Sequence, residues 1–431
     1  MKYRGLIAVG LATALVGGAT GCGTSSGSSG GQPDELTVWL MPEAKENWSA
    51  AVEQANRTFN EDHPEVTVHI REQDWTSYLT KFEAQLGSGN PPDVLELGNT
   101  QTAKYMANGA LLELTDEKST FDNSETWLKG LNDSCTFKGK LYCVPYYAAA
   151  RGIIYRKDMF EQAGIKEEPN SLSEFTKAMG KLQDEFDDNS KFSGYYFPGK
   201  YWYAAMSYVY DYGGQIAKRV DGKWKGTLDS PQSRKALGKL KKIVLKYSSA
   251  SKTSDEENRN QVFAEGGVAT MYSVSYDPGV ITGEDDGNPN LKGKLGAFPM
   301  PSHKSGEIMP SFLGGSDLDV PASTDAPELA KDWIRAYTSN KSMKTMVEDS
   351  SFLPNTTSLL EEAKKGSDDV AKAFITAGNK TWFVPSAKNW ASVEQRNIIP
   401  NMLVKIFTEK SSVQAATTQA SEQITKTLNQ G

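Results

Sequence analysis

The chain that follows the N-terminal segment alternates short apolar stretches with longer amphipathic ones. Leu36–Met41 alternates apolar and polar side chains, which predicts a strand, and Asn47–Asn60 repeats apolar residues at helical spacing. The alternation continues through Val66–Ile70, Thr76–Leu86, Val94–Leu97 and Thr100–Asn108. Strands and helices that alternate in this order predict a right-handed parallel α/β unit.

Helical spacing recurs through the rest of the chain, without an internal repeat. A length of 431 residues is too great for one domain of about 150 residues, so we expect two lobes. The later helices are expected near Ser171–Asp184, Ser230–Lys246, Pro327–Ser339, Met343–Asp349, Ala391–Phe407 and Ser411–Leu428.

The N-terminus has the pattern of an export signal. Lys2 and Arg4 precede the apolar run Leu6–Val16, and small residues lead into Cys22. This predicts a secretory signal peptide over residues 1–21. Cys22 after Ala-Thr-Gly resembles a bacterial lipobox, which implies cleavage before Cys22 and lipidation of its thiol. A plain signal peptide with an incidental cysteine is the alternative. Residues 22–33 would then be the lipidated cysteine and a flexible Gly/Ser tether.

Composition and charge narrow the class of protein. Hydrophobic residues make up 38% of the chain and charged residues 23%, which is ordinary for a globular protein and excludes bulk disorder. The formal net charge is −7, and no block rich in Lys and Arg occurs. A nucleic-acid partner is disfavoured, because phosphate binding needs a basic footprint. The one long apolar run lies at the N-terminus, so we expect contact with a membrane only through the lipid anchor.

Cys135 and Cys143 flank a segment with Gly139 at its midpoint. A three-residue turn, Lys138-Gly139-Lys140, would close a hairpin and place the two thiols directly opposite each other, within disulfide reach. Export to an oxidising environment favours this bond, and two unpaired thiols are the alternative. Cys-x-x-Cys and Cys/His zinc spacings do not occur in the sequence, so we expect no metal and no cofactor.

Polar and aromatic residues follow each of the three predicted strands. Glu43 comes after the first strand, Trp75 after the second, and Asn99, Thr100 and Gln101 after the third. Ligands of open parallel sheets bind beyond the carboxyl ends of the strands, so these residues are candidates for one binding edge. Core packing is the alternative for Trp75, and a helix N-cap is the alternative for Asn99 or Thr100.

Aromatic residues concentrate in two segments. Phe192–Tyr212 holds ten of them, where an overall content of 10% predicts about two. A second cluster comprises Trp382, Phe383, Asn389 and Trp390. One helical face cannot bury so many rings, and rings with polar neighbours suit the C–H faces and hydroxyl rims of a sugar. For any single ring, packing in the core is the alternative.

Several segments resemble the extracellular sugar-binding lipoproteins of ABC importers, the family 1 solute-binding proteins. They are the lipobox, Leu36–Leu40, Pro91–Val94, Gly139–Tyr146, Ile154–Asp158, Phe160 and Ala163-Gly164. Three further segments resemble the chito-oligosaccharide binders of Gram-positive bacteria: Leu97–Thr102, Phe197–Tyr203 and Phe312–Ser316. Lys200 and Asp317 depart from the pattern of that subgroup, which leaves the identity of the sugar open.

The resemblance implies an α/β protein with the two-lobe, periplasmic-binding-protein-like fold of type II. Each lobe would be a mainly parallel sheet flanked by helices, and the ligand would bind in the cleft between them. The first lobe would comprise residues 34–147 and 304–352, and the second lobe residues 148–303 and 353–431. The crossovers would lie near Ala148–Arg151, Pro301–Lys304 and Phe352–Asn355.

The resemblance also implies ligand-binding residues. Tyr147 would line the cleft from a crossover, Trp202 would be the stacking platform, and Asp317 would follow a Gly-Gly turn that lets the backbone approach a ligand. An ordinary solvated acid is the alternative for Asp317 and for Glu43. Together with Trp75 from the strand ends, the expected set is Glu43, Trp75, Asn99, Gln101, Tyr147, Trp202, Tyr276, Asp317, Asn389 and Trp390.

The implied function is capture of an oligosaccharide by lobe closure and its delivery to the permease of an ABC importer. The protein would be a lipid-anchored monomer at the extracellular face of the membrane. Because no G-x-x-x-x-G-K-[ST] phosphate-binding motif occurs in the sequence, ATP hydrolysis would fall to a separate chain. No G-x-S-x-G motif or distinctive pair of acids points to an enzyme. A binder of a peptide or polyol is one alternative, and a secreted glycosidase is another.

Overall fold

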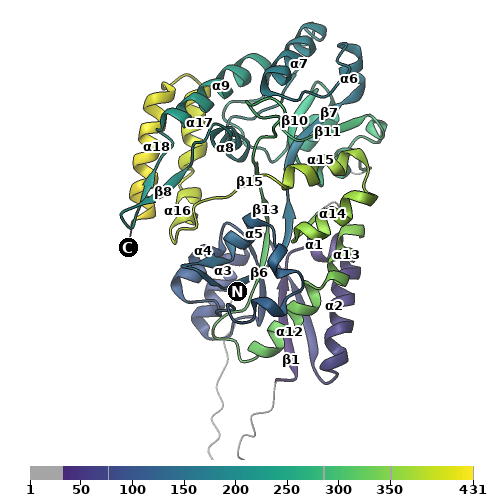
Figure 1. Ribbon diagram of the computed structural model, residues 1–431, viewed down its shortest axis with the longest axis vertical. Coiled ribbons are helices and arrows are strands. Elements are labelled where there is room, and N and C mark those ends of the chain that lie inside the picture. The colour runs from purple at the N-terminus through teal and green to yellow at the C-terminus, as the bar shows by residue number, and fades with distance from the viewer. Residues whose placement is uncertain (1–32, 76, 285–286, 350–351, 431) are drawn as a thin grey trace, which may run out of the picture.

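The computed structural model describes residues 33–75, 77–284, 287–349 and 352–430. The predicted signal peptide, Cys22 and nearly all of the tether lie outside these residues. The described chain forms two α/β lobes, one above the other in the view of Figure 1, joined where β6 and β13 run between them. This arrangement confirms the two-lobe fold that the sequence predicts.

The first lobe is built on a six-stranded sheet in the order β14-β6-β13-β3-β1-β2. Strands β1, β2 and β3 pair in parallel, as the alternating pattern predicts. Strand β13 runs antiparallel to both β3 and β6, so the sheet is mixed rather than mainly parallel. The strands span Glu35–Leu40 (β1), Thr67–Glu72 (β2), Val94–Gly98 (β3), Cys143–Ala149 (β6), Gly314–Asp319 (β13) and Leu353–Pro354 (β14).

The side chains of β1 alternate between two cores, one on each face of this sheet. Leu36 and Val38 pack in the core that includes residues of α2 (Ser49–Asp62), α12 (Pro327–Tyr337) and α13 (Asn340–Asp349). Trp39 and Met41 pack on the other face, with residues of α3 (Tyr78–Ser88) and α4 (Thr102–Asn108). Helix α1 (Glu43–Glu46) follows β1 and lies on the side that faces the other lobe (Figure 1). The carboxyl end of β1 therefore points toward the second lobe.

The second lobe contains a three-stranded sheet in the order β10-β7-β11. Strand β7 (Arg151–Arg156) pairs antiparallel with both β10 (Thr270–Val274) and β11 (Leu295–Phe298), so the expectation of a mainly parallel sheet is wrong for this lobe. Both outer strands are buried along their whole length. A strand buried on both faces lacks the apolar–polar alternation of a half-exposed strand whichever way it runs, so hydropathy does not encode its direction.

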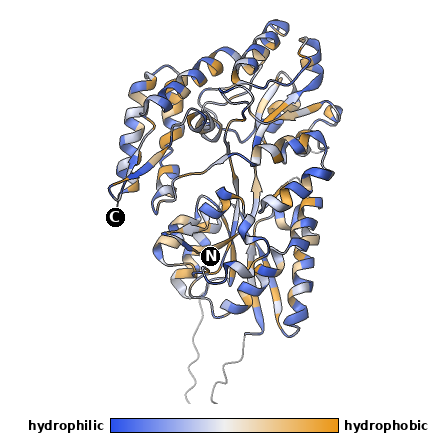
Figure 2. Ribbon diagram, in the orientation of Figure 1, coloured by the Kyte–Doolittle hydropathy of each residue, from blue (hydrophilic) through white to orange (hydrophobic). Residues whose placement is uncertain are grey.

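Helices surround this sheet and form most of the second lobe. Figure 2 shows hydrophobic residues concentrated on the inner sides of the elements in both lobes. The predicted helix Ala391–Phe407 is two helices, because Asn397 adopts a left-handed backbone conformation with φ of 50° between them. The helices span Lys157–Gln162 (α6), Leu172–Glu185 (α7), Trp202–Asp211 (α8), Pro231–Tyr247 (α9), Arg259–Glu265 (α10), Asp277–Ile281 (α11), Trp390–Gln395 (α16), Ile398–Phe407 (α17) and Val413–Leu428 (α18).

Two of the expected lobe boundaries differ from the structure. Residues 304–312 belong with the second lobe, because Met309 and Phe312 lie in its core and β12 (Ser311–Phe312) pairs with β15 (Thr381–Trp382). The chain passes to the first lobe at Leu313, since β13 starts at the next residue. Pro301 marks extended backbone, which by itself does not mark a change of lobe.

The last crossover is also longer than expected. Helix α14 (Thr357–Gly366) still packs on the first lobe, because Leu359 lies in the core with Trp48 and Val144. The second lobe resumes at α15 (Asp369–Gly378), where Phe374 packs against Ala297 of β11. The chain between β14 and α15 therefore lies against both lobes.

The disulfide between Cys135 and Cys143 forms, with Cα atoms 4.9 Å apart. The hairpin of β4 (Thr136–Phe137) and β5 (Lys140–Leu141) has a two-residue turn, Lys138-Gly139, rather than the expected three residues. Both turn residues have positive φ, 52° and 80°, which suits the tight twist of a two-residue hairpin. This register places Tyr142 opposite Cys135, and Cys143 begins β6 one residue later.

Candidate ligand-binding site

Three of the expected residues meet at the carboxyl ends of the parallel strands. The indole Nε1 of Trp75 donates to Glu43 Oε1 at 2.9 Å and to Oε2 at 3.1 Å. The Tyr78 hydroxyl donates to Gln101 Oε1, and the rings of Tyr78 and Trp75 meet edge to face at 5.5 Å. We call Glu43, Trp75, Tyr78 and Gln101 the strand-end cluster. With 37% of its surface exposed, Trp75 is the most accessible ring of this cluster.

Tyr78 lies in the predicted helix Thr76–Leu86, and the sequence analysis did not identify it as part of this cluster. Its ring is buried, but its hydroxyl lies at the strand ends, where the Gly98 N–H donates to it at 3.3 Å. Gly98 allows this close packing, because a Cβ there would lie 3.1 Å from Gln101 Oε1. A tyrosine at the first turn of a helix that follows a strand end is the signal that could have identified it.

Asn99 lies beneath the strand-end cluster and is buried. Its Nδ2 donates to the Leu313 carbonyl at 3.0 Å, and its backbone N–H donates to the Gly315 carbonyl at 3.0 Å. These bonds tie the end of β3 to the crossover into β13. The structure therefore shows Asn99 positioning the crossover, while direct contact with a ligand stays a prediction.

Tyr147 and Tyr276 lie on either side of Phe352, at the junction of the lobes. Tyr276 stacks on Phe352 with a centroid distance of 5.0 Å, and Tyr147 meets the same ring edge to face at 4.9 Å. Burial raises the pKa of Tyr147, and the charges of Glu96 and Glu43 raise it further. This column of rings brings two of the expected residues, one from each lobe, to the junction.

Glu96 is a buried acid below the same region. Its Oε2 accepts from the Met41 backbone N–H at 2.9 Å, and burial raises its pKa to about 7. The Ser316 hydroxyl donates to Tyr147 at 3.1 Å close by. Glu96 therefore supports the junction from inside the first lobe.

Aromatic residues from segments far apart in sequence form one wall on the second lobe. The Trp202 ring lies 4.0 Å from Tyr203 and 6.1 Å from Trp390, measured between centroids. We call Trp202, Tyr203 and Trp390 the aromatic wall; they line a cavity of about 240 Å³ together with Glu394. Of the ten aromatic residues in Phe192–Tyr212, six are buried in the core, so core packing explains most of that segment.

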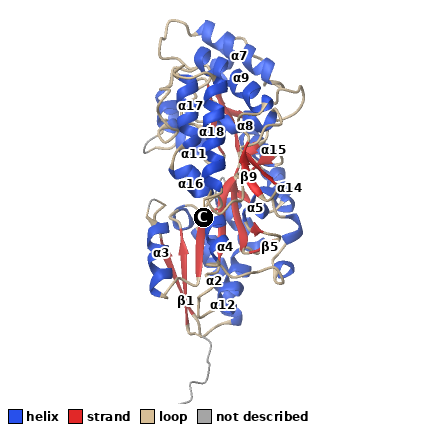
Figure 3. Cartoon of the chain, turned by 90° about the vertical axis from the view of Figure 1, so that its left-hand side faces the viewer, coloured by secondary structure: helices blue, strands red, loops and turns tan. Residues whose placement is uncertain are grey.

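Glu394 connects the aromatic wall to the first lobe. Burial raises its pKa to about 7, and interactions with Trp390 and with Thr100 of the first lobe lower it in part. Helix α4, which directly follows Gln101, contacts α16, so the aromatic wall lies on the side of the second lobe that faces the strand-end cluster. Figure 3 shows α16, which carries Trp390 and Glu394, lying between the second lobe and the elements of the first. Sequence reasoning missed Glu394, although it lies one helical turn after Trp390.

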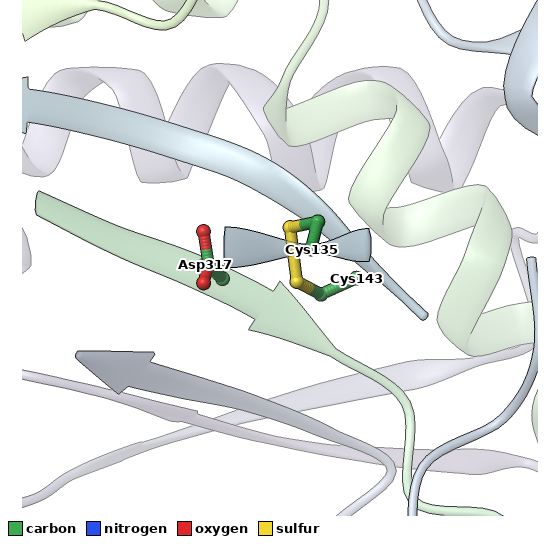
Figure 4. Close-up of side chains that lie close together, drawn as sticks. All are labelled: Cys135, Cys143 and Asp317. Atoms are coloured by element: carbon green, nitrogen blue, oxygen red, sulfur yellow. A yellow bond between two sulfur atoms is a disulfide. The ribbon is translucent and has the colours of Figure 1, made fainter. Parts of the chain in front are cut away.

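The structure does not bring Asp317 to the strand-end cluster or to the aromatic wall. The side chain is fully buried, and its two oxygens accept from Thr102 Oγ1 at 2.9 Å and from Ser134 Oγ at 3.0 Å. It lies beside the disulfide of Cys135 and Cys143, inside the first lobe (Figure 4). Burial raises its pKa to about 8. The sequence alone did not show that this strand residue points into the core.

Asn389 is not brought to the aromatic wall either. Its Nδ2 donates to the backbone carbonyl of Gln430, which ties the start of α16 to the end of the chain. Trp390, the next residue, is only 1% exposed and presents one edge to the cavity. Trp390 therefore lines the cavity, whereas Asn389 makes a structural hydrogen bond to Gln430.

A larger cavity of about 650 Å³ lies elsewhere between the lobes. It is lined by residues of α11, of α15 and of the segment Phe352–Pro354, together with residues of several other segments. None of the ten expected residues lines it. The cavity next to the aromatic wall is smaller, but it is the one that two of the expected residues, Trp202 and Trp390, line.

Two α/β lobes joined by repeated crossovers, with rings and polar groups on the facing surfaces, define a solute-binding protein of the two-lobe type. Residues 54–374 match the model of a family described as bacterial extracellular solute-binding protein. The chain belongs to this family. Among the described residues, no helix combines the length and the apolar character that crossing a bilayer requires.

Two proteins that bind oligosaccharides by name are similar to this chain in sequence. The diacetylchitobiose binding protein DasA of Streptomyces coelicolor is 29% identical over 427 residues, which covers 96% of this chain and 96% of that protein. The galactooligosaccharide-binding protein of Bacillus subtilis is 25% identical, over 81% of this chain and 79% of that protein.

Solved structures support the same fold. The sugar-binding protein MalE of Xanthomonas citri aligns with a TM-score of 0.80 at 19% identity, over 91% of this chain and 97% of that protein. The GacH receptor of Streptomyces glaucescens aligns with a TM-score of 0.74 at 22% identity, over 91% of this chain and 98% of that protein. At these identities the likeness establishes the fold alone.

Proposed function

We propose that this protein captures an oligosaccharide outside the cell and delivers it to an ABC importer. The observation that carries the proposal is that α16, which bears Trp390 of the aromatic wall, contacts α4, which directly follows Gln101 of the strand-end cluster. Rings supply apolar faces for the C–H surfaces of a sugar, and the polar groups supply hydrogen bonds to its hydroxyls.

Among oligosaccharides, a β-linked disaccharide of N-acetylglucosamine is the first candidate. The support is the relative named as a diacetylchitobiose binding protein, whose alignment covers nearly the whole chain. Resemblance of Leu97–Thr102 and Phe197–Tyr203 to chito-oligosaccharide binders points the same way. Galacto-oligosaccharides and maltose-type sugars are the comparison ligands, because the names of other relatives and neighbours contain them.

Binding would act through closure of the two lobes. A sugar held by the aromatic wall gains hydrogen bonds to the strand-end cluster only when the lobes approach. It therefore favours the closed state by its difference in affinity for the two states. A dissociation constant of about 1 µM corresponds to about −8 kcal/mol, which a few stacked rings and hydrogen bonds can supply.

The remaining parts of the proposal concern anchoring and partners. Cys22 would carry the lipid, and the Gly/Ser segment after it would tether a monomeric body above the membrane. The permease would recognise the closed form, and a separate chain would hydrolyse ATP. No chemical step on the sugar is proposed, so the ligand would leave the protein unchanged.

Isothermal titration calorimetry tests the proposal with diacetylchitobiose, a galacto-oligosaccharide and maltotetraose, and with a peptide and a polyol as the alternatives. We expect saturable binding of at least one oligosaccharide, with compaction in small-angle scattering when it binds. Binding of the peptide or polyol alone would contradict the proposal. Release of shorter sugars during incubation would instead favour the glycosidase alternative.

A further inference from the structure

Arg151 occupies a special place at the first crossover. It is the first residue of β7, and its backbone N–H donates to Ser311 Oγ at 2.8 Å. Its guanidinium lies over the ring of Tyr203 at 4.6 Å and over the ring of Phe312 at 5.1 Å. Tyr203 belongs to the aromatic wall, so a positive charge sits directly beside the proposed site.

The donors of this guanidinium are not used by the protein. Within the described part of the chain, Nε and Nη1 of Arg151 are buried and have no hydrogen-bond partner. Glu256 and Arg259 act on Arg151 through their charges, yet Arg151 forms no ion pair with any described residue. The residue as a whole is half-buried, and its exposed surface lies on atoms other than Nε and Nη1.

The neighbouring Arg259 shows what a structural arginine looks like in the same region. Its Nε donates to Asp277 Oδ2 at 2.9 Å and its Nη2 to Oδ1 at 2.8 Å. Asp277 is fully buried and also accepts from Asn260 Nδ2 at 2.8 Å. The carboxylate of Asp277 thus accepts hydrogen bonds from Arg259 and Asn260, and Arg151 forms no ion pair with a described acid.

The guanidinium of Arg151 indicates which kind of ligand group it would bind. Its planar fork of donors has no acceptor function and matches a planar oxygen acceptor best. A sugar hydroxyl both donates and accepts, whereas a carbonyl or carboxylate oxygen only accepts. Stacking on Tyr203 and Phe312 fixes the plane of the fork, so little side-chain freedom is lost when an acceptor binds.

We propose that Arg151 is a specificity-determining residue that binds an sp² oxygen on the sugar. Two kinds of sugar supply this oxygen: the amide carbonyl of an N-acetylated sugar and the carboxylate of a uronic acid. The inference rests on the proposed function. It states which group of the sugar, an sp² oxygen, the guanidinium of Arg151 would bind.

Calorimetry with four β-1,4-linked disaccharides tests it. Diacetylchitobiose carries the amide carbonyl, and cellobiouronic acid carries the carboxylate. Cellobiose has a hydroxyl in place of either group, and deacetylated chitobiose has an amine. The proteins are the wild type, Arg151→Gln, Arg151→Lys and the matched control Arg219→Gln, an exposed arginine that lies over Trp224 and does not line the cavity.

We expect the wild type to bind at least one of the two acceptor-bearing sugars tenfold or more tightly than cellobiose. Arg151→Gln should weaken binding of that sugar by about 10- to 100-fold and reduce its preference over cellobiose to below threefold. Arg151→Lys should retain part of the affinity, because it keeps the charge and loses the fork. Arg219→Gln should match the wild type. Whether diacetylchitobiose or cellobiouronic acid loses affinity in Arg151→Gln shows whether Arg151 binds the amide or the carboxylate.

Several results would overturn the inference. An equal loss of affinity for all four sugars in Arg151→Gln would show a structural role, and an unchanged preference would show no role. If the wild type bound only oligosaccharides that lack an sp² oxygen, such as maltotetraose, the inference would fail while the proposed function stood. Binding of no oligosaccharide would overturn both. If Arg151→Gln failed to fold, as judged by circular dichroism, the preference measured in Arg151→Lys would decide.

Discussion

The strand-end cluster of the first lobe and the aromatic wall of the second lobe are assembled from different kinds of structure. Glu43, Trp75 and Gln101 each follow one strand of a parallel unit, whose carboxyl ends converge whatever the rest of the chain does. Trp202 and Trp390 come from helices α8 and α16, which lie far apart in sequence and meet only through tertiary packing.

This difference separates two ways of making a binding surface. A surface at the strand ends is a direct result of local topology, and its residues stay close to their strands. A wall made of helices from distant segments depends on the core of the lobe, where Phe312 and Trp382 back the ring of Trp202 at 6.4 and 6.3 Å. We therefore expect the wall to supply most of the apolar binding energy and the cluster to adjust orientation.

The largest expected effect comes from the wall. Trp202→Ala should weaken binding of the preferred oligosaccharide by about 1–3 kcal/mol, because it removes the central ring of three. Calorimetry on Trp202→Ala and on the control Trp224→Ala, a half-buried tryptophan that does not line the cavity, checks this. Equal affinities in wild type and Trp202→Ala would remove the wall from the site.

A smaller effect should come from the contact that joins the two surfaces. Burial raises the pKa of Glu394 to about 7, although its interactions with Trp390 and Thr100 lower it in part, and opening of the lobes would hydrate the carboxyl and lower its pKa further. The closed form then favours the protonated acid, so binding should tighten several-fold as the pH falls from 8 to 6. Glu394→Gln should lose this dependence. A pH profile of the dissociation constant that is identical in both proteins would contradict this assignment.

The strand-end cluster should give a smaller effect still. Trp75→Phe keeps an aromatic ring but removes the two bonds from the indole to Glu43. We expect affinity to fall only about two- to fivefold, since one exposed hydrogen-bonded pair contributes about 0.5–1 kcal/mol. A loss as large as that of Trp202→Ala would reverse the ranking of the two surfaces.

The smallest effect on binding is expected at Asp317, inside the first lobe. Asp317→Asn should leave affinity within twofold of the wild type, because the side chain is buried beside the disulfide. Its effect should appear in stability instead. Burial raises the pKa of Asp317 to about 8, so the folded protein holds the proton more tightly than the unfolded chain.

The sign of that stability effect follows from linkage. Stability should fall as the pH rises from about 4 toward 8, by at most about 1.4 kcal/mol per pH unit for one such acid. Asp317→Asn has no charge to bury and should flatten this part of the profile of thermal midpoint against pH. The same slope in the variant would assign the loss to the other buried acids, Glu96 and Asp319.

Much of the first lobe could be predicted from the sequence. The order of strands and helices through Asn108 is confirmed to within a few residues, because each segment shows its own hydrophobic period. The meeting of Glu43, Trp75 and Gln101 at one edge follows from the same order. Strand β13, however, inserts between β3 and β6 from a segment more than a hundred residues away, and no local pattern announces that it runs antiparallel.

The sequence by itself determined the alternating unit, the binding edge of its strands and the spacing that lets Cys135 and Cys143 pair, since each depends on residues a few positions apart. Only the tertiary structure decided that Asp317 is buried, that Trp202 meets Trp390 and that Arg151, unlike Arg259, forms no ion pair with a described acid. Burial, contact and charge pairing depend on which distant segments pack together, and that outcome is a property of the whole core rather than of any local stretch of sequence.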